Sequence, residues 1–142
     1  MTVPSEEGRD LLKVTVYLLS LDAVDAQWLG TMLELLDPHE VERASRFRSP
    51  KQVREFVSAH ALRRLALAAA VGGTASDWRF ETDPLGRPTA IFPPAGLQAA
   101  CSLSHTTGLV GVAVVAGPCG CAIGFDLLPQ SYHIEVVALL ER

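Results

Sequence analysis

The stretch that decides the fold is Ser49–Gly73, SPKQVREFVSAHALRRLALAAAVGG. Its first residues resemble a helix start, because Ser49 can cap, Pro50 fits the first helical position and a glutamine is third. Apolar residues then recur on one side of the predicted helix, at Val53, Phe56, Val57, Ala61, Leu65 and Ala68. The pattern predicts one long helix that ends near Val71, before a pair of glycines.

Upstream of this helix the sequence predicts a strand and two shorter helices. Leu11–Leu21 (LLKVTVYLLSL) is β-branched and apolar, which is typical of a buried strand. We expect Asp22 to cap a helix, and Asp37-Pro38 to start another, with Glu40 completing a capping box. The apolar face of the first of these helices consists of Val24, Trp28, Met32 and Leu36.

Downstream of the long helix the spacing of apolar residues changes from that of a helix to that of extended strands. Strands are predicted at Trp78–Phe80, Thr89–Phe92, Ala99–Leu103, Leu109–Ala116 and Cys121–Leu128. The last segment, Ile134–Glu141, has a helical pattern without a cap or a stop signal, and it ends while still apolar. We therefore expect the chain to stop inside a helix.

Composition limits the class of protein. A length of 142 residues suits one domain, and 49% hydrophobic with 20% charged residues excludes a disordered or fibrous chain. No uncharged apolar run near either end approaches the ~20 residues of a membrane span, and the N-terminal segment is polar, so we expect neither a span nor a secretory signal. Three cysteines do not make a disulfide framework, which favours a reduced, cytoplasmic setting.

Basic residues are concentrated in one part of an acidic chain. Residues 43–64 hold seven bases and one acid, net +6, whereas the segments before and after them carry net charges of −7 and −3. The cluster predicts a local anion site or a basic face, and the alternative is a solvated helix surface. Nucleic acid is disfavoured, because the isoelectric point is about 5.5 and no aromatic residues alternate with the arginines. The bases are Arg43, Arg46, Arg48, Lys51, Arg54, Arg63 and Arg64.

Asp126 is the first candidate site residue, since it stands alone in the apolar run Ala122–Leu128. An unpaired carboxylate costs several kcal/mol to bury, so this position predicts a nearby cation, a metal ion or a water-filled cleft. The alternative is an aspartate at a strand end that caps the following turn.

Two further segments offer groups that suit a phosphate. Ser102–Gly108 (SLSHTTG) ends a strand in hydroxyls, an imidazole and a glycine, which can cradle a phosphate at a turn. A serine–histidine nucleophile pair is disfavoured, because neighbours on a strand point to opposite faces, and a structural histidine is the alternative. Gly86-Arg87-Pro88 places a cation at a tight turn.

Taken in order, these motifs resemble those of the 4'-phosphopantetheinyl transferases of the surfactin-synthetase-activating type. The resemblance runs through ERASRF at 42–47, FVSAHALRR at 56–64, GRP at 86–88, CSLSH at 101–105 and IGFD at 123–126. It implies an α+β fold, one half of a pseudo-dimer, with an antiparallel sheet packed against a long helix. It also implies Mg²⁺-dependent transfer of the 4'-phosphopantetheine arm from coenzyme A to a serine of an acyl or peptidyl carrier protein, in fatty-acid, polyketide or nonribosomal-peptide biosynthesis.

The resemblance also assigns roles to individual residues. Asp126 falls on a catalytic Mg²⁺ ligand, Ser104 and His105 on the segment that contacts the nucleotide phosphates, and Gly86-Arg87-Pro88 on a turn against the adenosine end. Arg43 and Lys51 fall at or near basic positions that meet phosphates of coenzyme A. The residues expected to bind coenzyme A are thus Arg43, Lys51, Gly86, Arg87, Pro88, Ser102, Ser104 and His105.

Three features depart from the family pattern. Leu128 stands where many members carry a second acid, Arg87 replaces a lysine, and the Trp-x-x-Lys-Glu-Ala motif of the family's second half does not occur in this sequence. We therefore expect residues 1–128 to form an N-terminal transferase subdomain and residues 129–142 to begin a connecting helix toward a missing second half. A homodimer or a separate second half would complete the site. The alternative is a non-catalytic module that binds coenzyme A or a partner chain.

Overall fold

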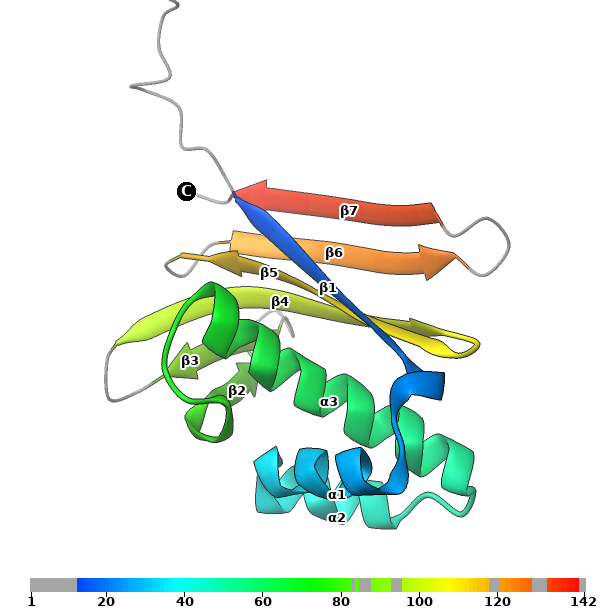
Figure 1. Ribbon diagram of the computed structural model, residues 1–142. Helices are drawn as coiled ribbons and strands as arrows, with labels where there is room; N and C mark the ends of the chain where they lie inside the picture. Colours follow the sequence, from blue (N-terminus) through cyan, green and yellow to red (C-terminus); the bar gives the residue numbers. More distant parts are fainter. Residues whose placement is uncertain are drawn as a thin grey trace, which may run out of the picture.

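The computed structural model of the chain describes residues 13–82, 84, 88–92, 96–117, 121–128 and 133–140. Three layers lie one above another, namely a group of helices, a five-stranded sheet and a two-stranded hairpin (Figure 1). The α+β class, with an antiparallel sheet packed against a long helix, is therefore confirmed. Among the described helices, none is both long and apolar enough to cross a bilayer.

The helical layer consists of α1 (Ala26–Leu35), α2 (Pro38–Ser45) and α3 (Pro50–Ala70), with two short 3₁₀ helices, η2 (Leu21–Ala23) and η3 (Ala75–Asp77). The main sheet has the order β1-β5-β4-β3-β2 and is antiparallel throughout. Its strands are β1 (Val14–Ser20), β2 (Arg79–Thr82), β3 (Pro88–Phe92), β4 (Leu97–Thr106) and β5 (Leu109–Ala116). The hairpin pairs β6 (Cys121–Leu128) with β7 (His133–Leu140).

Two of the three predicted helix starts are confirmed. Asp37 accepts a hydrogen bond from the Glu40 amide at 2.7 Å while the Glu40 carboxylate accepts one from the Asp37 amide at 3.0 Å, which is a complete capping box. Ser49 caps α3 through the Lys51 amide at 3.2 Å. The prediction for Asp22 is wrong, because Asp25 caps α1 through the Trp28 amide at 2.8 Å. Asp22 lies instead in η2.

The main sheet is covered on both faces because side chains alternate along its strands. On one face Val112 and Val114 of β5 pack with Ala66 and Leu67 of α3. On the other face Ala113 of β5 packs with Leu127 of β6, together with residues of β1. β5 is therefore buried along most of its length, and β6 is held against the face opposite α3 (Figure 1).

The helix expected at the end of the chain is a strand. Residues 134–140 belong to β7, which runs antiparallel to β6 with Glu135 opposite Asp126, and Glu141 lies outside the described residues. Ile134, Val136 and Val137 are β-branched, which favours an extended backbone, and pairing with β6 provides partners for the backbone groups of β7. The apolar period misled the prediction because a short apolar run without caps fits either a helix or a strand.

Candidate functional site

A pocket of about 360 Å³ lies between the helical layer and the end of β4. Three of the residues predicted to bind coenzyme A line it, namely Arg43 of α2 and Ser104 and His105 of β4. The structure thus brings together side chains that are more than 60 positions apart in the sequence. The remaining lining residues are Phe47, Gln52, Glu55, Phe56, Ala59, His60 and Leu103.

Phe56 organises one wall of this pocket. Its ring stacks on the imidazole of His60, with centroids 4.1 Å apart, and meets the ring of Phe47 at 5.4 Å. The guanidinium carbon of Arg43 lies 5.2 Å from the centroid of the same ring. Within the described part of the chain Arg43 forms no ion pair with a carboxylate, so its charge is available to an anionic ligand.

Ser104 joins the pocket to the hairpin. Its hydroxyl oxygen accepts a hydrogen bond from the backbone amide of Leu127 at 3.0 Å, which fixes β6 against β4. Asp126, the predicted metal ligand, precedes Leu127 in β6 and stands opposite Glu135 of β7 in the ladder. Asp126 is therefore the neighbour in sequence of Leu127, whose amide binds the pocket residue Ser104.

The other predicted site residues lie apart from this pocket or outside the described residues. Lys51 lines a neighbouring cavity of about 420 Å³ at the start of α3, together with Arg54 and Gly108. Ser102 lies in β4 opposite Ala113 and does not line either of these cavities. Pro88 begins β3, opposite Thr82, and Gly86 and Arg87 lie outside the described residues.

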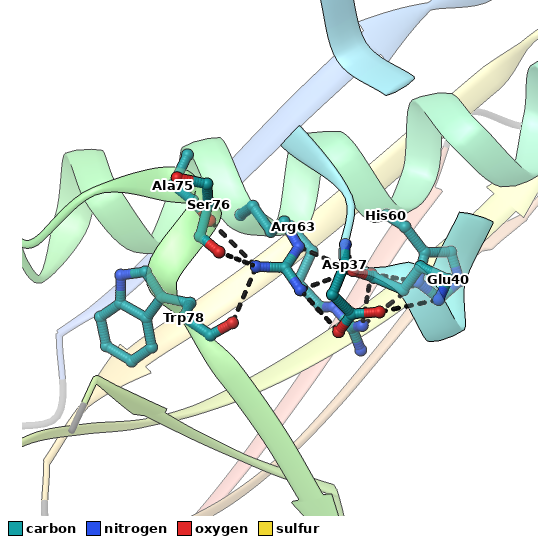
Figure 2. A network of polar contacts seen from close by, with 8 residues as sticks. Asp37, Glu40, His60, Arg63, Ala75, Ser76 and Trp78 are labelled. Carbon is teal, nitrogen blue, oxygen red and sulfur yellow. Dashed lines mark hydrogen bonds and ion pairs between the residues drawn. The ribbon is translucent and has the colours of Figure 1, made fainter. Parts of the chain in front are cut away.

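Arg64 is the centre of a buried polar network beside the pocket, although the sequence placed it in a basic segment predicted to form a local anion site or a basic face. It is fully buried, and its guanidinium donates to Glu40 at 2.5 and 2.8 Å and to Asp37 at 3.0 Å. It also donates to the backbone carbonyls of Ala75, Ser76 and Trp78 at 3.1, 3.1 and 2.7 Å. Figure 2 shows Asp37 and Glu40, at the start of α2, on one side of the network and the carbonyls of the segment before β2 on the other. Arg64 thus connects elements of the fold and is not available to a ligand.

His60 links this network to the pocket. Its Nδ1 lies 3.2 Å from Glu40 Oε2 and 3.2 Å from Nη2 of Arg63 (Figure 2). His60 is also one of the residues that line the pocket. Burial raises the pKa of Glu40, but hydrogen bonds with His60, the Asp37 amide and Arg64 outweigh this and bring the pKa to about 2. Burial lowers the pKa of His60, although the hydrogen bond with Glu40 opposes the change. A neutral imidazole therefore adjoins an ionised carboxylate near pH 7.

Sequence analysis did not single out His60 as a site residue. It was quoted within FVSAHALRR, where Phe56 precedes it by four residues and Arg63 follows it by three. This spacing places the three side chains on one face of α3 and was the available signal. Its partner Glu40 is 20 residues away in the sequence and was assigned to a capping box alone.

Comparisons with known proteins give a match at the level of structure. No protein-family model and no curated protein sequence matches the chain. A holo-(acyl-carrier-protein) synthase from Bacillus anthracis in complex with CoA (3',5'-ADP) matches with a TM-score of 0.57 and 21% identity, over 72% of this chain and 93% of the synthase. A holo-[acyl-carrier-protein] synthase from Helicobacter pylori in complex with coenzyme A matches with a TM-score of 0.53 and 13% identity, over 74% of this chain and 100% of the synthase.

These matches concern the fold as a whole, because they extend over nearly the full length of both synthase chains. They agree with the antiparallel sheet, the long helix and the order of elements described above. The chain therefore has the fold of these two holo-(acyl-carrier-protein) synthases.

Proposed function

We propose that this chain binds coenzyme A in the pocket lined by Arg43, Ser104 and His105 and takes part in transfer of the 4'-phosphopantetheine arm to a serine of a carrier protein. The observation that carries the proposal is the convergence of these three side chains within a fold shared with two synthases whose structures contain coenzyme A or its nucleotide. The transfer joins the serine oxygen to the pantetheine phosphate and releases 3',5'-ADP.

The pocket has groups that suit a multiply phosphorylated ligand. Arg43 offers a cation without a carboxylate partner in the described part of the chain, and Ser104 and His105 offer short polar groups at a strand end. Lys51 and Arg54 line the adjacent cavity. Their positive charges can attract a second phosphate group of the ligand that lies outside the pocket. We further propose that Gly86, Arg87 and Pro88 contact the adenosine end of coenzyme A. We also propose that Ser102 belongs to the coenzyme A site through the segment of β4 that carries Ser104 and His105.

Asp126 is the residue that we propose to hold Mg²⁺. The metal fits this position because Mg²⁺ prefers oxygen ligands, and the β6–β7 register sets a second acidic residue, Glu135, opposite Asp126. When bound, the ion would offset the charge of the pyrophosphate during phosphoryl transfer. In this proposal Glu135 stands in for the acid that Leu128 replaces, and Ser104 holds the strand that carries Asp126.

Two measurements test the proposed function. Isothermal titration of the chain with coenzyme A and Mg²⁺ should give a saturable heat, and incubation with an apo carrier protein should add one phosphopantetheine to its mass. A chain that gives no heat at millimolar coenzyme A would contradict the proposal. Binding without any mass gain would favour the second candidate, a non-catalytic coenzyme A module.

Completion of the site by another chain is a further part of the proposal. We propose that a second half, provided by a separate chain or replaced by a second copy, adjoins the subdomain of residues 1–128. Residues 133–140 are not a connecting helix toward it, because they form β7 and pair with β6. Trp28, with 56% of its surface exposed, and Leu18, with 48% exposed, are large apolar side chains that such an association could cover. If a second copy completes the site, sedimentation velocity of the chain alone should show a dimer or larger species, and a monomer at all concentrations would contradict completion by a second copy.

A further inference from the structure

The pocket lining has little net charge with which to bind a phosphate. Its titratable side chains are Arg43 of α2, Glu55 and His60 of α3, and His105 of β4. The charges of Arg43 and Glu55 cancel formally, so the lining is neutral when both imidazoles are neutral. A phosphate dianion that enters this pocket therefore favours protonation of an imidazole, because the added proton offsets the negative charge.

His60 is placed to take that proton. Its Nδ1 is engaged by Glu40 and Arg63, and one face of its ring lies on Phe56. Its other nitrogen, Nε2, makes no hydrogen bond with the described part of the chain, and His60 is one of the residues that line the pocket. Nε2 is therefore the polar atom that His60 can offer to a ligand.

Glu40 provides the second requirement, an acceptor for the other side of a charged imidazole. A protonated histidine donates from both nitrogens. Glu40 Oε2 lies 3.2 Å from Nδ1 and is ionised, so it can accept from Nδ1 while Nε2 donates into the pocket. Arg63 then loses the contact of its Nη2 with Nδ1 and keeps its contact with Glu40 at 3.3 Å.

We propose that His60 recognises a phosphate group of the ligand by taking up one proton from solvent, so that Nε2–H donates to the phosphate beside Arg43 while Nδ1–H donates to Glu40. This rests on the proposed function, because the ligand is coenzyme A. In the free protein burial, Arg63 and Arg43 lower the pKa of His60, whereas Glu40 raises it, so the imidazole is neutral near pH 7 before the ligand arrives. An adjacent phosphate reverses the effect of the two arginines.

Proton uptake can be measured directly on the unmodified protein. Isothermal titration with coenzyme A in two buffers of different ionisation enthalpy should show net proton uptake near pH 7. The affinity should fall as the pH rises from 6 to 8, by up to about tenfold per pH unit for one linked proton. Part of any such slope belongs to the ligand's own phosphate, so variants are needed to assign it.

His60→Gln keeps an amide that can donate to Glu40 but has no titrating group. It should reduce the proton uptake and flatten the pH profile of affinity. The matched control is His39→Gln, since His39 is exposed and lines a different cavity, and it should leave both quantities unchanged. A slope that persists in His60→Gln and disappears in His105→Gln would overturn the proposal for His60.

The two levels of the proposal fail in different ways. Failure of the unmodified chain to bind coenzyme A at any pH would overturn the proposed function together with the role of His60. Binding with an unchanged pH slope in His60→Gln would overturn only the role of His60. If that variant does not fold, the ring-proton shifts of His60 in the unmodified protein give the answer. Their titration midpoint should rise when coenzyme A is added, and an unmoved midpoint would contradict the proposal.

Discussion

Arg64 is the residue on which the helical layer depends most. Replacement by methionine keeps the length of the side chain but removes the ion pair with buried Glu40 and the hydrogen bonds that Arg64 donates to three backbone carbonyls. Breaking a buried ion pair in this way costs about 3–5 kcal/mol, so Arg64→Met should lower the free energy of unfolding by that amount. Urea denaturation followed by circular dichroism measures the change.

The matched control for Arg64 is Arg46, which pairs with Glu42 at 2.7 Å on the surface of the molecule. Both side chains of this pair are largely exposed, at 71% and 61%, so solvent screens their attraction. Arg46→Ala should therefore change the free energy of unfolding by less than about 1 kcal/mol. Equal changes in the free energy of unfolding for Arg64→Met and Arg46→Ala would show that the buried position of Arg64 adds nothing to the stability of the fold.

Asp126 is the residue on which the proposed metal site depends. Asp126→Ala should remove the part of coenzyme A binding that requires Mg²⁺, because it deletes the oxygen ligand proposed for the ion. The midpoint of urea denaturation should stay close to that of the unmodified chain. Titration calorimetry with and without Mg²⁺ separates the two effects, and an unchanged affinity in the presence of Mg²⁺ would remove Asp126 from the site.

Residues differ in how far the sequence could predict their roles. The capping roles of Asp37 and Ser49 were predictable, because each acts on an amide two or three positions away. The pairing of Arg64 with Glu40 spans 24 positions and depends on how α2 packs against α3, so the sequence could only place Arg64 in a basic segment. For the same reason His60 was quoted within a motif but not identified as a pocket residue.

At the scale of elements, the contact between β4 and β6 positions the hairpin. Ser104→Ala removes the acceptor of the Leu127 amide, and Leu127 is a buried residue with 5% exposure. A buried donor without a partner costs about 1–3 kcal/mol, so the variant should be destabilised by that amount. Hydrogen exchange at the Leu127 amide should also accelerate.

Ser102→Ala is the control for this element contact, because Ser102 lies in the same strand and forms no hydrogen bond through its side chain in the described part of the chain. It should leave the exchange rate of the Leu127 amide unchanged. Protection of that amide in Ser104→Ala equal to that in the unmodified chain would mean that the hairpin is held by its apolar contacts alone.

Elements also differ in how well a local pattern specifies them. α3 was predicted closely, since its start signal, its apolar period and its terminal glycines agree. β7 was predicted as a helix, because a short apolar run fits either state and its β-branched residues are only a weak local preference. The pairing with β6 decides for the strand, and no local pattern contains it. The two-sided burial of β5 likewise became evident once β6 was placed on the far face of the sheet.

For the whole molecule, the network around Glu40 predicts how stability depends on pH. The folded-state pKa of Glu40 is about 2 against an ordinary value of 4.5, so its contribution is complete above pH 4.5 and is lost as the pH falls toward 2. The pKa of His60 is lowered from 6.5, so charging its buried imidazole also opposes folding as the pH falls below that value. Both groups therefore lower the free energy of unfolding as the pH falls, and neither makes it depend on pH above pH 7.

The two groups act in different pH windows, which allows them to be separated by thermal unfolding between pH 7 and pH 3. In the unmodified chain the melting temperature should fall in both windows. His60→Gln should flatten the part just below pH 6.5, while Glu40→Gln should melt at a lower temperature at pH 7 and flatten the part below pH 4.5. Because Glu40 connects α2 with α3 and, through Arg64, with the segment before β2, its protonation should loosen these elements together. If the melting temperature of Glu40→Gln falls below pH 4.5 as steeply as that of the unmodified chain, other carboxylates control the acid stability of the fold.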